Sequence, residues 1–95
     1  MLDLTRFYIN GEWVEPHSKD TFPILNPSTE KEIGQITLGN KTDVDRAVSA
    51  AAAAFDSFSI RSKSDRLSLL TNLHEISVNR LEDLAQAMTM EMGAP

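Results

Sequence analysis

The sequence contains no cysteine, so disulfide bridges, thiolate metal ligands and a cysteine nucleophile are excluded within these residues. Basic side chains are also scarce, because nine Lys and Arg face 14 Asp and Glu, which leaves a net charge of −5. Nucleic acids and anionic membranes need a basic patch on the protein that binds them. We therefore expect neither a nucleic acid nor a membrane as a partner.

Long hydrophobic runs are absent as well. No apolar stretch approaches the roughly 18 residues of a membrane-spanning helix, and the opening MLDLTRFYIN lacks the apolar core of a signal peptide. Glycine is sparse, and no dinucleotide-binding G-x-G-x-x-G, Walker loop or G-x-S-x-G pattern occurs. From these absences we expect a soluble cytoplasmic protein without a phosphate-binding loop or a nucleophile elbow.

The remaining composition is that of an ordinary globular protein, with 41% hydrophobic and 24% charged residues. A chain of 95 residues fits one small domain. A domain of this size hides only about 60–65% of its unfolded surface, so its core is expected to be thin.

The stretch FYINGEWV, from Phe7 to Val14, carries the strongest local signal. Asn10-Gly11 separates two short runs rich in aromatic and β-branched residues, and both central residues of the favoured hairpin turn need positive φ. The pattern predicts a hairpin with strands over Phe7–Ile9 and Glu12–Glu15.

Further strand signals continue to about residue 40. A second strand is predicted over Thr21–Leu25, and Pro23 within it indicates an edge position because proline cannot donate to the ladder. Asn26-Pro27-Ser28-Thr29 is typical of a turn, and Glu32–Leu38 completes a second hairpin. Residues 1–40 are thus predicted as a β-hairpin region and residues 41–95 as a helical region.

An amphipathic helix is predicted over Asp43–Phe58, with Thr42 as N-cap and Asp45 approximating a capping box. One face carries the apolar side chains Val44, Ala47, Val48, Ala51, Phe55 and Phe58. Ser62 or Ser64 is expected to cap the next helical stretch. Its apolar stripe consists of Leu70, Leu73, Leu81, Leu84 and Met88. This stretch is one bent helix or two consecutive helices, with a break expected near Asn79-Arg80 and an end at Gly93.

Candidate catalytic and metal-binding side chains do not form a recognisable pattern. His17 and His74 each stand alone in the sequence, which favours surface histidines over an acid–base or metal role. The carboxylate pairs Asp43/Asp45 and Glu30/Glu32 are explained by helix capping and by a solvated turn. We therefore predict no catalytic, cofactor-binding or metal-binding residue within the chain.

Aromatic and sulfur-containing residues are interpreted as packing residues. Tyr8 and Trp13 are expected to cover the hairpin against the helices. Met88, Met90 and Met92 fit a core or an interface. Glu91 falls on the same stripe as Leu84 and Met88, so either the helix frays before it or Glu91 meets a donor outside residues 1–95.

Several motifs taken in order resemble the N-terminal end of the NAD(P)-dependent aldehyde dehydrogenase superfamily. The series consists of FYINGEWV, then FPILNPSTEKEIGQI from Phe22 to Ile36, then the helix over Asp43–Phe58. It closes with Arg66, Leu70, Leu73, Ile76, Arg80, Leu84, Ala85, Glu91 and Gly93. INGEWV alone would be a weak signal, but INGEWV followed by NPSTEKEIG is specific. The closing EMGAP departs from the E-x-G-K that is commonest in the family, which bears on subfamily.

The resemblance implies a large enzyme with a Rossmann-like cofactor domain, a catalytic domain and an oligomerisation arm, assembled as a homodimer or a homotetramer. Such enzymes oxidise an aldehyde to a carboxylic acid: a cysteine attacks the aldehyde, hydride passes to NAD or NADP, and water activated by a glutamate releases the acid. The resemblance places these residues downstream of this segment, so the chain is expected to be an inactive scaffold whose partner is the remainder of the parent chain. It also implies a monovalent cation near the main chain of Ile24 and Leu25, with other ligands outside the chain.

A second reading is an independent acidic α+β interaction module without catalysis, in which Trp13 and the methionine-rich end form the contact surface. Such a module would be a monomer that unfolds cooperatively. A scaffold segment would instead leave apolar helix faces uncovered and would self-associate or bind dyes. Neither reading identifies the aldehyde or distinguishes NAD from NADP.

Overall fold

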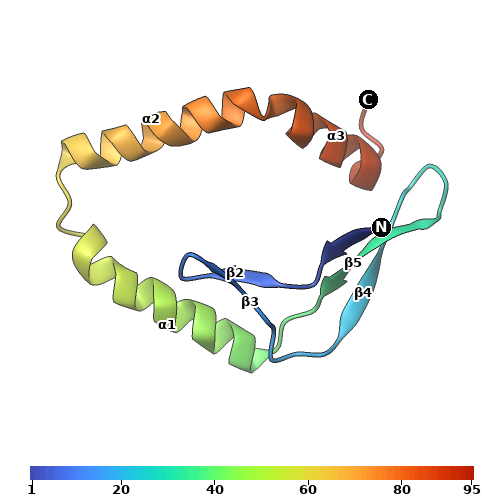
Figure 1. The fold of residues 1–95 in the computed structure, drawn as a ribbon, viewed down its shortest axis with the longest axis horizontal. Helices are drawn as coiled ribbons and strands as arrows, with labels where there is room; N and C mark the ends of the chain where they lie inside the picture. The colour runs from blue at the N-terminus through green and yellow to red at the C-terminus, as the bar shows by residue number, and fades with distance from the viewer.

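The computed structural model describes all of residues 1–95 as short strands followed by helices (Figure 1). The elements are β1 (Leu2–Leu4), β2 (Phe7–Ile9), β3 (Glu12–Val14), β4 (Thr21–Leu25), β5 (Glu32–Thr37), α1 (Lys41–Phe58), α2 (Lys63–Asn79) and α3 (Leu81–Met92). The predicted α+β arrangement of hairpins followed by two or three helices is confirmed. No helix combines the length and the hydropathy that a membrane crossing requires.

The first hairpin forms as its turn residues predict. β2 and β3 pair antiparallel, with Phe7 opposite Val14 and Tyr8 opposite Trp13. Asn10 and Gly11 have φ values of 55° and 78°, which are the left-handed conformations that a two-residue hairpin turn needs. The hairpin packs beside α1, inside the curve of the helices (Figure 1).

The second sheet has the order β1-β5-β4. β4 and β5 pair antiparallel, and Pro23 lies on the edge strand as predicted. The sequence analysis did not predict β1, which pairs parallel to β5 with Leu2 opposite Gly34. A Cβ at Gly34 would lie 2.6 Å from the Cβ and the carbonyl oxygen of Leu2, so only glycine lets β1 approach β5 this closely.

The first helix begins earlier than predicted. Its N-cap is Asn40, not Thr42, and the side chain of Asn40 accepts a hydrogen bond from the backbone N–H of Asp43. The Asp43 carboxylate in turn accepts from the N–H of Asn40 and closes a capping box. Asp45 has no part in the cap and forms an exposed ion pair with Lys41 at 2.6 Å.

The later helices follow the predicted signals. Ser62 caps α2 by accepting a hydrogen bond from the N–H of Asp65. The helical stretch breaks at Arg80, as expected, and leaves two consecutive helices. α3 ends at Gly93, whose φ of 72° is the left-handed conformation of a glycine C-cap.

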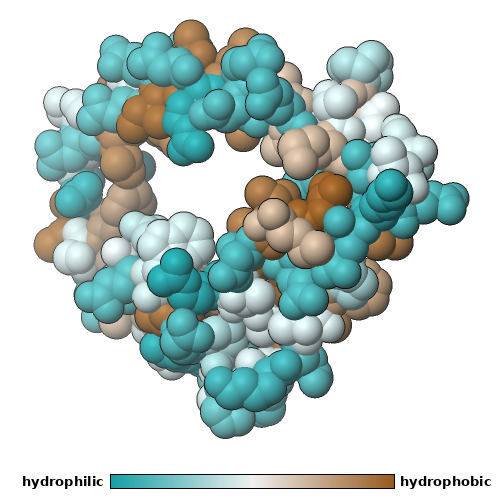
Figure 2. Space-filling model, turned by 45° about the vertical axis from the view of Figure 1, so that its right-hand side comes forward, coloured by the Kyte–Doolittle hydropathy of each residue, from teal (hydrophilic) through white to brown (hydrophobic).

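The whole chain forms an open ring without an apolar core. Figure 2 shows an opening through the molecule, and the principal extents are 49 × 34 × 15 Å. The radius of gyration is 17.0 Å, whereas a compact domain of this length measures about 12 Å. The ring closes where Gly93, after α3, lies against Pro27 in the β4–β5 turn. No hydrophobic side chain is fully buried.

Candidate functional site

The structure gathers polar side chains in one place, where the loop between β3 and β4 meets the N-terminus of α1. Asp43 is 4% exposed there, which makes it the most buried charged residue of the chain. Its carboxylate accepts from the backbone N–H of His17 at 2.7 Å and from that of Ser18 at 3.1 Å. Asp43 therefore fastens this loop to the helix, in addition to capping the helix.

The N-cap fixes the orientation of the Asn40 amide. Its oxygen accepts from the Asp43 N–H, so its nitrogen faces the Nδ1 atom of His17 at 2.9 Å. An amide nitrogen can only donate. His17 Nδ1 is therefore the acceptor, and the proton of the neutral ring lies on Nε2. His17 is exposed, as expected of a surface histidine, but the fold also brings its ring to Asn40 and its backbone N–H to Asp43, contacts that its position in the sequence did not predict.

Two opposing effects act on the pKa of Asp43. Burial acts to raise the pKa by disfavouring the charged carboxylate. The backbone N–H donors of Asn40, His17 and Ser18 outweigh burial and hold the pKa below its ordinary value of 3.8. The carboxylate is thus held ionised at neutral pH, where it serves as a hydrogen-bond acceptor.

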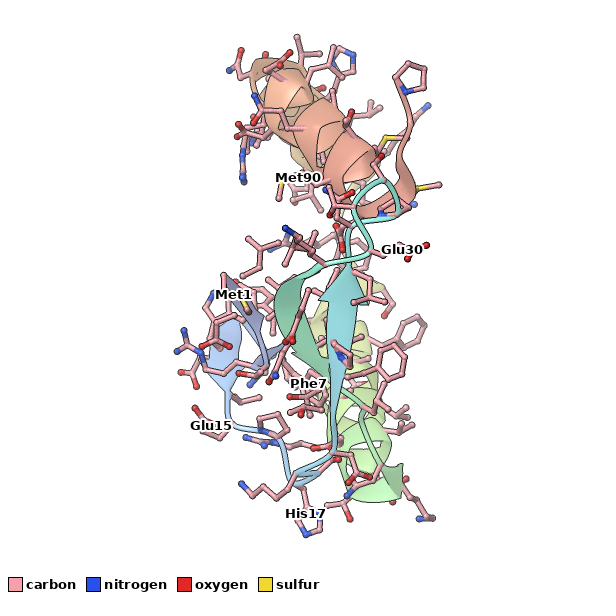
Figure 3. All side chains as sticks on the ribbon, turned by 90° about the vertical axis from the view of Figure 1, so that its right-hand side faces the viewer. Met1, Phe7, Glu15, His17, Glu30 and Met90 are labelled. Carbon is pink, nitrogen blue, oxygen red and sulfur yellow. The ribbon has the colours of Figure 1, made fainter.

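The other candidate residues do not converge on this cluster. Figure 3 shows His17 at one end of the strands and Glu30 at the other end, close to Met90. His74 lies on α2. The Glu32 side chain accepts a hydrogen bond only from the Gln35 amide, three positions along the chain. No group of three His, Cys, Asp or Glu side chains is close enough to hold a metal ion.

The structure shows no catalytic constellation at the polar cluster. A general base needs a substrate proton within reach and a nucleophile needs a base beside it. The Asp43 oxygens already accept three backbone N–H bonds, and Ser18 Oγ accepts from the N–H of Asp20. The geometry of the cluster is that of a structural crosslink.

The aromatic pair of the first hairpin is less covered than predicted. The Tyr8 and Trp13 rings contact each other in a tilted arrangement, with centroids 5.2 Å apart and an interplanar angle of 59°. Both side chains stay more than 60% exposed, so the expectation that they pack between the hairpin and the helices is not met within these residues. The Glu91 side chain, also exposed, makes no hydrogen bond or ion pair within the chain.

Many large apolar side chains of the molecule are uncovered. The chain exposes 7807 Å², whereas a folded monomer of this mass exposes about 5,400 Å². Brown apolar side chains reach the surface on the helices and beside the opening of the ring (Figure 2). The helix residues that are more than half exposed include Val44, Val48, Phe55, Leu67, Leu70, Leu73, Ile76, Leu81, Leu84 and Met88.

The uncovered apolar surface is clearest on helix α2. At about 100° per residue, the apolar side chains from Leu67 to Val78 spread over roughly 200° of its circumference. A helix that is hydrophobic over so wide an arc is normally buried on more than one side. In this chain α2 contacts little besides α3.

Short hairpins followed by uncovered helices are typical of a segment that completes its core against other polypeptide. The chain belongs to the aldehyde dehydrogenase family, because the model of the "Aldehyde dehydrogenase family" matches residues 13–95. A Staphylococcus aureus (strain bovine RF122 / ET3-1) protein classed as an aldehyde dehydrogenase is 47% identical over the whole chain, which covers 20% of that protein.

Solved structures agree with the family assignment. The crystal structure of aldehyde dehydrogenase from Bartonella henselae superposes with a TM-score of 0.98 at 39% identity, over all of this chain and 20% of that one. A cysteine-to-alanine mutant of Aldehyde Dehydrogenase C from Pseudomonas syringae, in complex with NAD+ and octanal, gives a TM-score of 0.93 at 42% identity, over 95% of this chain and 19% of that one. The chain therefore spans about a fifth of the length of these relatives and matches an N-terminal part of them.

Proposed function

We propose that residues 1–95 are the N-terminal scaffold of an NAD(P)-dependent aldehyde dehydrogenase. The complete enzyme oxidises an aldehyde to a carboxylic acid through a cysteine thiohemiacetal, and its catalytic residues lie outside this chain. We also propose that the complete enzyme is a homodimer or a homotetramer, following the resemblance of the sequence to that family.

The observation that carries the proposal is the match along the whole chain to the Bartonella henselae enzyme, combined with an excess of exposed surface of about 2,400 Å² over a compact monomer. An area of this size is in the range of obligate interfaces. The relative that was solved with NAD+ and octanal supports the same class of cofactor and substrate here.

The residues of this chain do not themselves fit a nicotinamide cofactor. The dinucleotide-binding fingerprint presents backbone N–H groups to the pyrophosphate through uncovered glycines at the start of a helix. Gly34 is covered by Leu2, and Gly39, which precedes α1, lies against Phe7. Gly11 and Gly93 shape a turn and a helix end. We therefore assign no cofactor contact to residues 1–95.

The alternative function, an independent interaction module, requires a core of its own. The structure offers no buried hydrophobic side chain for one, and its helices are uncovered along most of their length. The scaffold proposal accounts for this surface, whereas the module proposal does not.

An activity assay tests the proposal. The chain alone, mixed with NAD+ or NADP+ and octanal, is expected to give no nicotinamide reduction. The complete polypeptide that contains this chain is expected to reduce the cofactor. The matched control is the complete polypeptide with its nucleophilic cysteine changed to alanine, which should be inactive although correctly folded. Reduction by the chain alone, or a correctly folded complete polypeptide without dehydrogenase activity, would overturn the proposal.

A further inference from the structure

The turn of the first hairpin combines an asparagine with a following glycine in an exposed position. We propose that Asn10 is a site of spontaneous deamidation, which gives an aspartate and an isoaspartate at position 10. The inference rests on the turn itself and is independent of the proposed enzyme function.

The chemistry needs no enzyme or cofactor. The backbone nitrogen of Gly11, after losing its proton to solvent base, attacks Cγ of Asn10 and forms a five-membered succinimide. The side-chain nitrogen leaves as ammonia. Water then opens the ring at either carbonyl, which leaves a normal aspartate or an isoaspartate whose main chain runs through the former side chain. No electron is gained or lost in these steps.

The structure leaves both reacting groups free. The side-chain amide of Asn10 and the backbone N–H of Gly11 take part in no hydrogen bond of the structure, and both residues are exposed. No atom lies within 4 Å of the position that a Cβ would occupy at Gly11. The side of Gly11 on which a side chain would lie is therefore open space, and the exposed residue leaves its N–H within reach of solvent base.

The other asparagines are protected, each by a different feature. Asn26 precedes Pro27, whose nitrogen carries no proton to lose. The Asn40 side chain is held by the N-cap hydrogen bond from Asp43 and by His17, and a lysine follows it. Asn72 and Asn79 lie in α2 and precede leucine and arginine. Asn10 is thus singled out by structure as well as by sequence.

The modification changes the hairpin in a defined way. An aspartate keeps the turn, because Asp-Gly also favours the type I′ conformation, but adds one negative charge beside α1. An isoaspartate lengthens the main chain between Ile9 and Glu12. The pairing of Tyr8 with Trp13 depends on a turn of two residues, so the isoaspartate form is expected to lose this register.

The test follows the peptide masses of the complete polypeptide that contains this chain, in buffer at neutral pH and at pH values above it. We expect the peptide that contains Asn10 to gain the mass of an NH2-to-OH exchange, faster at higher pH, while the peptides of Asn72 and Asn79 keep their amides. Part of the product should be methylated by a protein isoaspartate methyltransferase. The Asn10→Asp chain is the matched control and should show no further gain in that peptide.

A parallel sample in concentrated urea, where the turn is unfolded, gives the rate of deamidation that the Asn-Gly sequence has without the turn geometry. The proposal predicts that Asn10 reacts in native buffer as well as in urea. It is overturned if Asn10 keeps its amide in native buffer as long as Asn72 does, whether or not it reacts in urea.

Discussion

At the scale of single residues, Asn40 and Asp43 link the strand region to the helical region through a network of hydrogen bonds. Each satisfies a backbone group of the other, and Asp43 also reaches across 25 and 26 positions of sequence to Ser18 and His17. Buried carboxylates are stable only when several donors meet them. The cluster is therefore the main polar link between the loop that follows β3 and the helical region.

Removing the helix cap should cost measurable stability. Asn40→Ala loses the side-chain acceptor for the Asp43 N–H and is expected to lower the free energy of unfolding by about 1 kcal/mol. Thr42→Ala is the matched control, because Thr42 caps nothing, and should change stability by less than about 0.5 kcal/mol. Urea unfolding of the complete polypeptide measures both variants. Equal effects of the two substitutions would contradict the assignment of Asn40 as N-cap.

The lowered pKa of Asp43 predicts a specific loss of stability in acid. A carboxyl group whose pKa is lower in the folded state stabilises the fold above its unfolded value of about 3.8. That contribution is lost as pH falls through the lower folded pKa, because the unfolded state binds the proton more readily. Asp3, whose pKa is lowered chiefly by the Thr5 hydroxyl, acts in the same pH range.

The Asp43→Asn variant tests this assignment. It should unfold at lower urea concentration at pH 7 and should lose part of the pH dependence below pH 4 in the complete polypeptide. The Asp45→Asn variant, which removes only an exposed ion pair, is the control and should keep the acid dependence of the unmodified protein. An unchanged acid profile in Asp43→Asn would show that Asp43 contributes nothing there.

At the scale of elements, local signals predicted most of the fold. The Asn10-Gly11 turn, the Ser62 cap, the break at Arg80 and the Gly93 end each depend on residues within a few positions of one another. Strand β1 was missed because Leu2–Leu4 is too short to show a period, and its partner β5 lies about 30 positions away. Such a pairing leaves no local trace in a sequence.

The polar cluster escaped prediction for a similar reason. Asp43 was interpreted as part of a helix end, which is correct but incomplete, because its bonds to His17 and Ser18 are set by the tertiary fold. The N-cap was misplaced because Thr42-x-x-Asp45 and Asn40-x-x-Asp43 both resemble a capping box, and only the second is formed. Sequence spacing alone could not choose between them.

The contact between β1 and β5 predicts that position 34 tolerates only glycine. Gly34→Ala places a methyl group 2.6 Å from Leu2 and should cost about 1–3 kcal/mol, with β1 displaced from the sheet. Gly39→Ala is the matched control, since its Cβ would meet the Phe7 ring at 3.4 Å, an ordinary contact. Amide hydrogen exchange in the complete polypeptide should show faster exchange in β1 only for Gly34→Ala. Equal protection of β1 in both variants would rule out this packing.

At the scale of the whole molecule, the chain is an open ring and not a self-contained domain. A catalytic site needs groups held together by a packed core, and here the elements enclose an opening that lacks one (Figure 2). The chain belongs to the aldehyde dehydrogenase family and spans about a fifth of the length of its relatives, which agrees with a role in supporting other polypeptide. The wide apolar arc of α2, from Leu67 to Val78, is the surface that most requires other polypeptide to cover it.

The central claim is that this chain completes its core only against the remainder of a larger enzyme, and calorimetry of the purified chain alone tests it most directly. A self-sufficient domain of this length absorbs about 65 kcal/mol in one cooperative transition. We predict no such transition, together with self-association on size exclusion and binding of a hydrophobic dye. A monomeric chain that unfolds in a single transition of that enthalpy would contradict the account.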